Sequence, residues 1–241
     1  MNKMKKLALS LLLVLPIVGS AAGMGIYIPF SVGDTAELSH ESDQSYNTFD
    51  QTLDFKPAVG FGIAFDSNIG KDKLFNYRIG LEYVNAEMDT STINGYTSSC
   101  GGHDYCDMTR INLVQTFGFG VLRTKTVRLW VGPRINIAWN YRSNDYDAGY
   151  YTANESEVAF EFGVAPAVGV NVNLGRVVSL AFDVDYRVAG VVGAWNDDGD
   201  TGSYSGTVKG ATARFSLLFR FGEEFQKQAP QEPQAAVDQS L

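Results

Sequence analysis

The chain has 241 residues, of which 45% are hydrophobic and 19% charged, with 25 glycines, 3 Trp, 12 Tyr and 15 Phe. This apolar content excludes disorder throughout, and the length suits one or two domains, single all-β barrels included. The formal net charge of −8 makes nucleic acid a poor partner, and two cysteines and two histidines leave little material for metal clusters.

The first 22 residues have the pattern of a secretory signal peptide. Three of the first six residues are lysines, an apolar run covers residues 7–18, and small residues follow up to Ala22. The apolar run is shorter than the about 20 residues that a membrane-spanning helix needs. We therefore predict export, with cleavage after Ala22, and no spanning helix in the mature chain.

Eight segments alternate between apolar and polar residues with a period of two, which is typical of β-strands. The clearest covers residues 179–188, and residues 211–221 repeat its pattern. The other six begin near residues 25, 55, 75, 108, 127 and 158. Because helical spacing fits none of them, the chain is predicted to be all-β. Pro57, Pro133 and Pro166 fall inside these segments, where each removes a ladder hydrogen bond, so we expect local bulges there.

Long polar connections alternate with short ones along the chain. Loops are predicted at residues 33–54, 89–107, 143–157 and 196–207, and short turns at 66–74, 123–126 and 174–177. Transmembrane barrels show this alternation, with short turns in the periplasm and long loops outside the cell. The polar strand faces are rich in Gly, Ala, Ser and Asn, and aromatic residues gather toward both strand ends, as in membrane girdles. The sequence therefore predicts an eight-stranded antiparallel up-and-down transmembrane β-barrel over residues 23–221.

These features together resemble the small outer-membrane β-barrel family, which includes the opacity-type adhesins and the barrel domain of outer membrane protein A. The most specific part is the last strand, from Ala213 to Phe221, which looks like the strand that the barrel-assembly machinery reads. The resemblance implies a monomer in the outer membrane of a Gram-negative envelope, in contact with lipid and lipopolysaccharide. Residues 222–241, dominated by Gln, Pro and Glu, are predicted to form a disordered periplasmic tail.

Charged residues on the polar faces are predicted to lie inside the barrel. Isolated buried charges are too costly, so these groups must pair or hydrate. We expect a network that plugs the lumen, and the alternative is a narrow ion path gated by the same pairs. The predicted members are Arg78, Glu82, Arg110, Arg128, Arg134, Glu161, Asp183, Asp185, Arg187, Arg214 and Arg220.

The second long loop contains both cysteines. Cys100 and Cys106 are predicted to form a disulfide, because exported proteins meet an oxidising periplasm. A zinc or copper site that also uses His103 and Asp104 is the alternative. In the last loop, the segment Asn196-Asp197-Asp198-Gly199-Asp200 has oxygen ligands at alternating positions, as a calcium loop does, but Thr207 stands where the bidentate Glu belongs. The candidate metal ligands there are Asp197, Asp198 and Asp200.

Function is predicted to reside in the acidic loop surface. Catalysis would need a general base, and His40 and His103 both fall in predicted loops; His40-Glu41-Ser42 only mimics the His-x-Ser pair that lipid A deacylases carry on a strand. We predict no enzymatic activity, no cofactor and an adhesion-type role. A narrow porin-like channel is the alternative, and a lipid A-modifying enzyme the lesser one. The loop aromatics expected to make contacts, or merely to fold the loops together, are Tyr96, Tyr105, Tyr146, Tyr150, Tyr151 and Tyr204.

Overall fold

The computed structural model describes residues 22–43, 48–67, 74–100, 106–124, 126–147, 152–175, 177–197 and 200–221. The predicted tail and the predicted signal peptide, except for its last residue Ala22, lie outside these residues. Within them, no helix has the length and apolar character needed to cross a membrane. The strands are β1 (Ala22–Ser42), β2 (Thr48–Phe55), β3 (Ala58–Asp66), β4 (Phe75–Ile93), β5 (Tyr96–Ser99), β6 (Asp107–Arg123), β7 (Val127–Asp147), β8 (Thr152–Leu174), β9 (Val178–Asp197) and β10 (Asp200–Phe221).

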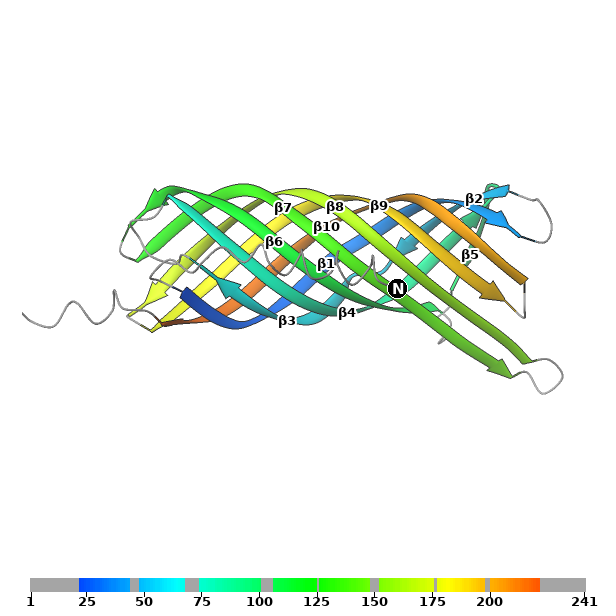
Figure 1. Cartoon of the computed structure of the whole chain (residues 1–241), viewed down its shortest axis with the longest axis horizontal. Helices are drawn as coiled ribbons and strands as arrows, with labels where there is room; N and C mark the ends of the chain where they lie inside the picture. Colours follow the sequence, from blue (N-terminus) through cyan, green and yellow to red (C-terminus); the bar gives the residue numbers. More distant parts are fainter. Residues whose placement is uncertain are drawn as a thin grey trace, which may run out of the picture.

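The strands close into an antiparallel barrel (Figure 1). Positions that are neighbours in the ring follow one another in the chain, and β1 pairs with β10 over almost its whole length to close the wall. β2 and β3 share one position, since each lies between β1 and β4, and β5 is an extra strand on β4. The ring therefore has the eight positions that the alternating pattern predicts. Closure satisfies the backbone groups that a bilayer cannot.

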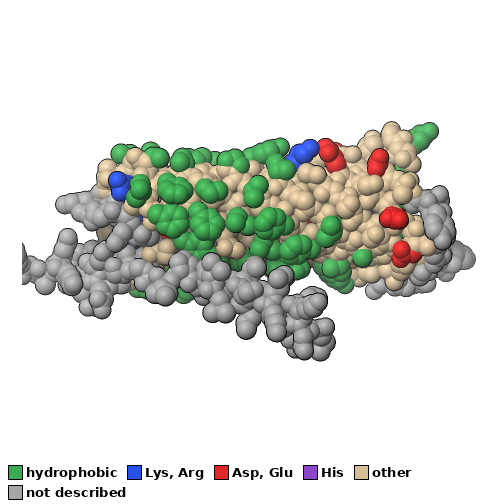
Figure 2. All heavy atoms as spheres, turned by 45° about the horizontal axis from the view of Figure 1, so that its top comes forward, with side chains coloured by type: hydrophobic (Ala, Val, Ile, Leu, Met, Phe, Trp, Pro, Cys, Tyr) green, Lys and Arg blue, Asp and Glu red, His purple; other side chains and the backbone are tan. Residues whose placement is uncertain are grey.

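An apolar belt surrounds the barrel toward its short-turn end. Exposed hydrophobic side chains occupy alternate positions of the wall, for example at residues 24–32 of β1 and 180–192 of β9. Figure 2 shows hydrophobic side chains gathered over this part of the barrel and acidic ones near the opposite end. Such a surface is stable in contact with lipid, which confirms the transmembrane character of the fold.

The strands are much longer than the belt requires. About 9–11 residues of a tilted strand span a bilayer, whereas β7 to β10 have 20–23 residues each. The short turns lie where they are predicted, but much of the four predicted long loops is strand. The alternation inverts there because the outer face of the wall meets water instead of lipid, so exposed positions become polar and buried ones apolar.

A bulge in β1 reverses which side chains face the lumen. The register with β10 shifts between Ser31 and Asp34, and Gly33 has a φ of 118°, a left-handed conformation that favours glycine. On the short-turn side of the bulge, odd-numbered residues such as Tyr27 are buried; beyond it, even-numbered residues such as Leu38 are buried. Asp34 consequently points into the barrel instead of belonging to a loop.

Pro57 interrupts the second wall position. β2 ends at Phe55 and β3 begins at Ala58, while Lys56 between them donates its backbone N–H to the Glu87 carbonyl at 2.9 Å. The register between β2 and β4 shifts at the same place, between Asp54 and Phe55. The irregularity expected at this proline is therefore present, as a break in the strand.

Pro133 and Pro166 behave differently, because they face each other across β7 and β8 without a change of register. Such a pair fits a non-hydrogen-bonded position, where both nitrogens face the outer neighbours β6 and β9. Pairing is skipped on those two sides, at residues 132–133 of β7 and 165–166 of β8. The bulge expected here is wrong: the prolines remove ladder bonds on both flanks while the central ladder stays continuous.

Candidate functional site

Seven charged side chains form a continuous group across the middle of the lumen. Arg134 donates Nη2 to Asp183 Oδ1 at 2.6 Å and Nη1 to Asp185. Arg78 donates Nη1 to the other oxygen of Asp183 at 3.1 Å and Nε to Asp66 at 3.0 Å. Arg214 joins Glu82 and Asp185. All seven residues are at most 6% exposed, so they form a layer of ion pairs inside the wall.

A second group of four lies farther from the short-turn end. Arg187 donates Nη2 to Asp34 Oδ2 at 2.6 Å, and Arg110 donates to the same oxygen. Arg110 also donates Nη2 to Glu161 at 3.1 Å, and the Arg187 guanidinium lies 3.6 Å from that carboxylate. The four residues come from β1, β6, β8 and β9, so this group links strands across the lumen.

The interior charges are balanced. Counting Arg128, which donates to the Leu74 carbonyl at 3.3 Å, six arginines and six Asp or Glu residues are buried in the described parts of the chain. The sequence predicted seven cations and four carboxylates, because Asp34 was placed in a loop and Asp66 in a turn. Arg220 is not among the buried charges: it is half-buried at the short-turn end and donates to the Gly175 carbonyl. Balance matters because an unmatched buried charge is costly.

Neutral side chains fill the space between the charges. Thr116 accepts from Arg134 Nε at 2.8 Å, and Asn112 donates to Glu82 at 3.0 Å. The cavity beside Tyr27 in this layer has a volume of about 10 Å³, which is space for roughly one water molecule. The middle of the lumen is thus packed with side chains.

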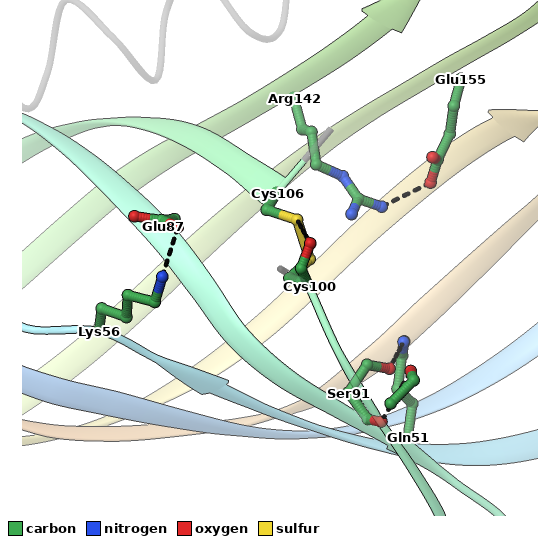
Figure 3. The surroundings of a disulfide bond; sticks show 9 residues. Gln51, Lys56, Glu87, Ser91, Cys100, Cys106, Arg142 and Glu155 are labelled. Atoms are coloured by element: carbon green, nitrogen blue, oxygen red, sulfur yellow. Dashed lines mark hydrogen bonds and ion pairs between the residues drawn. A yellow bond between two sulfur atoms is a disulfide. The ribbon is translucent and has the colours of Figure 1, made fainter. Parts of the chain in front are cut away.

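Beyond the charges, an apolar cluster of buried side chains lies in the lumen. Its buried members come from β1, β2, β4, β8, β9 and β10 and from the two cysteines: Ala36, Leu38, Leu53, Met88, Cys100, Cys106, Ala159, Ala189, Val191, Tyr204 and Val208. The disulfide between Cys100 and Cys106 is part of this cluster (Figure 3), with Cα atoms 5.9 Å apart and Cys106 fully buried. The predicted disulfide is therefore present, and it lies within the buried apolar cluster.

Removing this disulfide is expected to lower the free energy of unfolding by about 2 kcal/mol, because the short loop it closes gains entropy in the unfolded chain. The variant is Cys100→Ala with Cys106→Ala, which keeps both positions apolar. Urea unfolding of the barrel in lipid vesicles measures the change. The unsubstituted protein treated with dithiothreitol should shift equally, and equal midpoints for oxidised, reduced and variant protein would contradict the prediction.

His40 and Tyr204, both predicted in loops, lie on β1 and β10 beyond the belt and face the lumen. The His40 ring stacks on Phe49 with centroids 4.6 Å apart and is 8% exposed. Tyr204 is 5% exposed and donates its hydroxyl to Glu157. Burial lowers the pKa of His40 and raises that of Tyr204, which favours the neutral form of each. The assignment of Tyr204 to an exposed loop contact is wrong, since the strand continues through it.

The other predicted surface residues are only partly described. Tyr96 lies on β5 and is 85% exposed, and Tyr146 belongs to β7. Asp197 and Asp200 face each other across the β9–β10 turn, and the described residues contain no group of three His, Cys, Asp or Glu that could hold a metal. Outside the described residues lie Asp198, His103, Asp104, Tyr105, Tyr150 and Tyr151.

Comparisons with known proteins support the fold. No protein-family model and no curated protein matches the chain. Among solved structures, it is similar to the outer membrane protein OprG from Pseudomonas aeruginosa, with 9% identity over 85% of this chain and 97% of that chain and a TM-score of 0.55. A major outer membrane protein from Thermus thermophilus gives 14% identity over 80% and 99% of the two chains, with a TM-score of 0.44. The chain thus has the barrel fold of outer membrane proteins.

Proposed function

We propose that this protein is a non-conducting, non-catalytic outer-membrane barrel that acts by surface contact, in the manner of an adhesin. The observation that carries the proposal is the surplus length of its strands. Beyond the lipid belt, the wall continues as a polar surface, and the pairing of β7 with β8 runs on to Asp147–Thr152 after the pairing of β6 with β7 ends at Thr109–Tyr141. The resulting hairpin projects from the barrel (Figure 1).

The filled lumen supports this function over the alternative of a narrow channel. A conducting path would have to pass both groups of buried ion pairs and the apolar cluster at the mouth. Each guanidinium in the two groups already contacts carboxylates from other strands, so opening a path requires several pairs to separate together. Surface contact requires no such rearrangement.

The proposed export, assembly and membrane location of the protein rest on its sequence. Residues 1–22 would direct export, the strand ending at Phe221 would be read by the assembly machinery, and the belt would hold a monomer among lipid and lipopolysaccharide. Acidic residues on the exposed wall, such as Glu37, Asp50 and Asp54, would favour a basic partner surface through electrostatic complementarity.

Planar bilayers test the closed lumen. We expect the purified barrel to insert without stable single-channel steps under applied voltage, whereas a general porin run in the same apparatus should show them. Insertion is checked independently by a heat-modifiable band recovered from the same lipid. Reproducible steps from the inserted barrel would overturn this part of the proposal and support the channel.

A shortened hairpin tests the surface role. Replacing residues 143–156 with Asn-Gly, a dipeptide suited to a two-residue turn, keeps the Arg142–Glu157 ion pair at its base, whose N···O distance is 2.8 Å. Cells that display the full barrel should sediment together or bind cultured epithelial cells, and cells with the shortened hairpin should lose most of that binding. A full-length variant with Asp145→Asn, Asp147→Asn and Glu155→Gln separates charge from shape. Equal binding by the unsubstituted barrel, by both variants and by cells without the protein would refute the proposal.

A further inference from the structure

The outer wall carries a groove within the apolar belt. It has a volume of about 870 Å³ and runs across β7, β8 and β9 to the edge of β10. Half of its lining residues are small, namely Gly132, Pro133, Ala165, Pro166, Ala167 and Ala211, and the others are four valines, Asp185 and Tyr186. The outward-facing residues Pro133, Pro166 and Tyr186 are exposed, so nothing from the described chain covers the groove.

The opposed prolines account for the hollow at this place. Because Pro133 and Pro166 interrupt the pairing of β7 with β6 and of β8 with β9, the wall departs from regular pairing on both sides of the β7–β8 ladder. Their compact rings, together with the small side chain of Ala211 on β10, project little from the outer surface, whereas the valines and Tyr186 flank them. The hollow therefore depends both on the small residues of the sequence and on the register that places the two prolines opposite each other.

The belt formed by β1 and β3 is different. Its outward-facing side chains are large and exposed: Ile26, Ile28, Phe30, Phe61 and Ile63. Large outward-facing side chains of this kind are sufficient to form a lipid-facing wall without a hollow. The groove is thus a local feature of the belt, and the β1–β3 wall provides an internal reference for it.

We infer that this groove holds one acyl chain of a membrane phospholipid as a resident ligand. The groove is continuous with the lipid-facing belt, with Val164 and Val168 belonging to both, so its occupant must be apolar and present in the bilayer. A flexible hydrocarbon chain fits an open, largely apolar hollow, and an unfilled hollow would forfeit dispersion contacts along its floor. The inference goes beyond the proposed function, since a closed surface-contact barrel does not require it.

Photolabelling tests the inference. The barrel is placed singly in nanodiscs of phosphatidylglycerol that contain a trace of the same lipid with a diazirine at the end of one acyl chain. After illumination and digestion, mass spectrometry compares label on the groove segments of β7 to β9 with label on β1 and β3. We expect about fivefold enrichment in the groove, the ratio that roughly ten additional carbon contacts would produce.

Ala211→Phe fills the groove and should abolish the enrichment. Ala213→Phe is the matched control, because Ala213 has the same orientation two residues further along β10 but does not line the groove, and it should leave the enrichment intact. Equal labelling of both walls, or enrichment that survives Ala211→Phe, would overturn the inference. A parallel experiment uses discs that hold two barrels. If the groove label is lost there and crosslinks form between the two copies, the groove binds a second copy, which also overturns the inference. An absence of label on either wall would show that the barrel is not embedded, which also refutes the proposed function; conductance does not affect this test.

Discussion

Asp183→Asn is expected to lower the free energy of unfolding by about 3–5 kcal/mol, the cost of breaking a buried ion-pair group from one side. Asp183 is 1% exposed and accepts from Arg134 at 2.6 Å and from Arg78 at 3.1 Å. The amide keeps the volume but removes the charge, which leaves the guanidiniums with an excess positive charge in a closed lumen. Urea unfolding in lipid vesicles, followed by the heat-modifiable band on gels, measures the loss.

Two further variants separate charge balance from general damage. Glu37→Gln removes a carboxylate from an exposed pair with Lys209 and should change the free energy of unfolding by about 1 kcal/mol or less. Asp183→Asn combined with Arg134→Met restores the charge balance and should recover part of the lost stability. If Asp183→Asn unfolds at the same urea concentration as the unsubstituted barrel, the network does not hold the wall together.

Gly25→Val is expected to lower the free energy of unfolding by about 3 kcal/mol or more, because it forces the seam of the barrel apart. Gly25 lies opposite Leu218 where β1 meets β10, and a Cβ at this position would lie 1.9 Å from the Leu217 carbonyl oxygen. That atom is backbone, so relief requires the two strands that close the ring to separate. The folded fraction on unheated gels, and its urea midpoint, report the loss.

Gly25→Ala and Gly190→Ala form a matched pair that tests the seam, because a Cβ alone already meets backbone at Gly25. Gly190 lies on β9, and a Cβ there would have no atom within 4 Å. Its substitution should leave the unfolding midpoint close to that of the unsubstituted barrel. A comparable loss in both variants would show that the sensitivity belongs to strand glycines in general and not to the seam.

The sequence determines the class of fold because lipid imposes a strict rule on the outside of the wall. Within the belt, every second residue must be apolar, so the segment at residues 179–188 could be assigned as strand and oriented from its pattern alone. The same rule identified interior charges such as Arg78, Arg134 and Asp185, since charged residues that alternate with lipid-facing ones have only the lumen to occupy. The short turns followed from the ends of these patterns.

The tertiary structure decided what the alternation does not encode. Beyond the belt the outer face is exposed to water, so the alternation of apolar and polar residues inverts. Much of the predicted loops is therefore strand, and these strands place His40 and Tyr204 toward the lumen. The bulge at Gly33 turns Asp34 toward Arg187, 153 residues away, and only closure of the ring brings those two together. The groove likewise depends on register, since Pro133 and Pro166 hollow the wall because they are paired with each other. Local sequence specifies which face each residue takes in lipid, whereas partners across the lumen are set by shear and closure, which are properties of the whole ring.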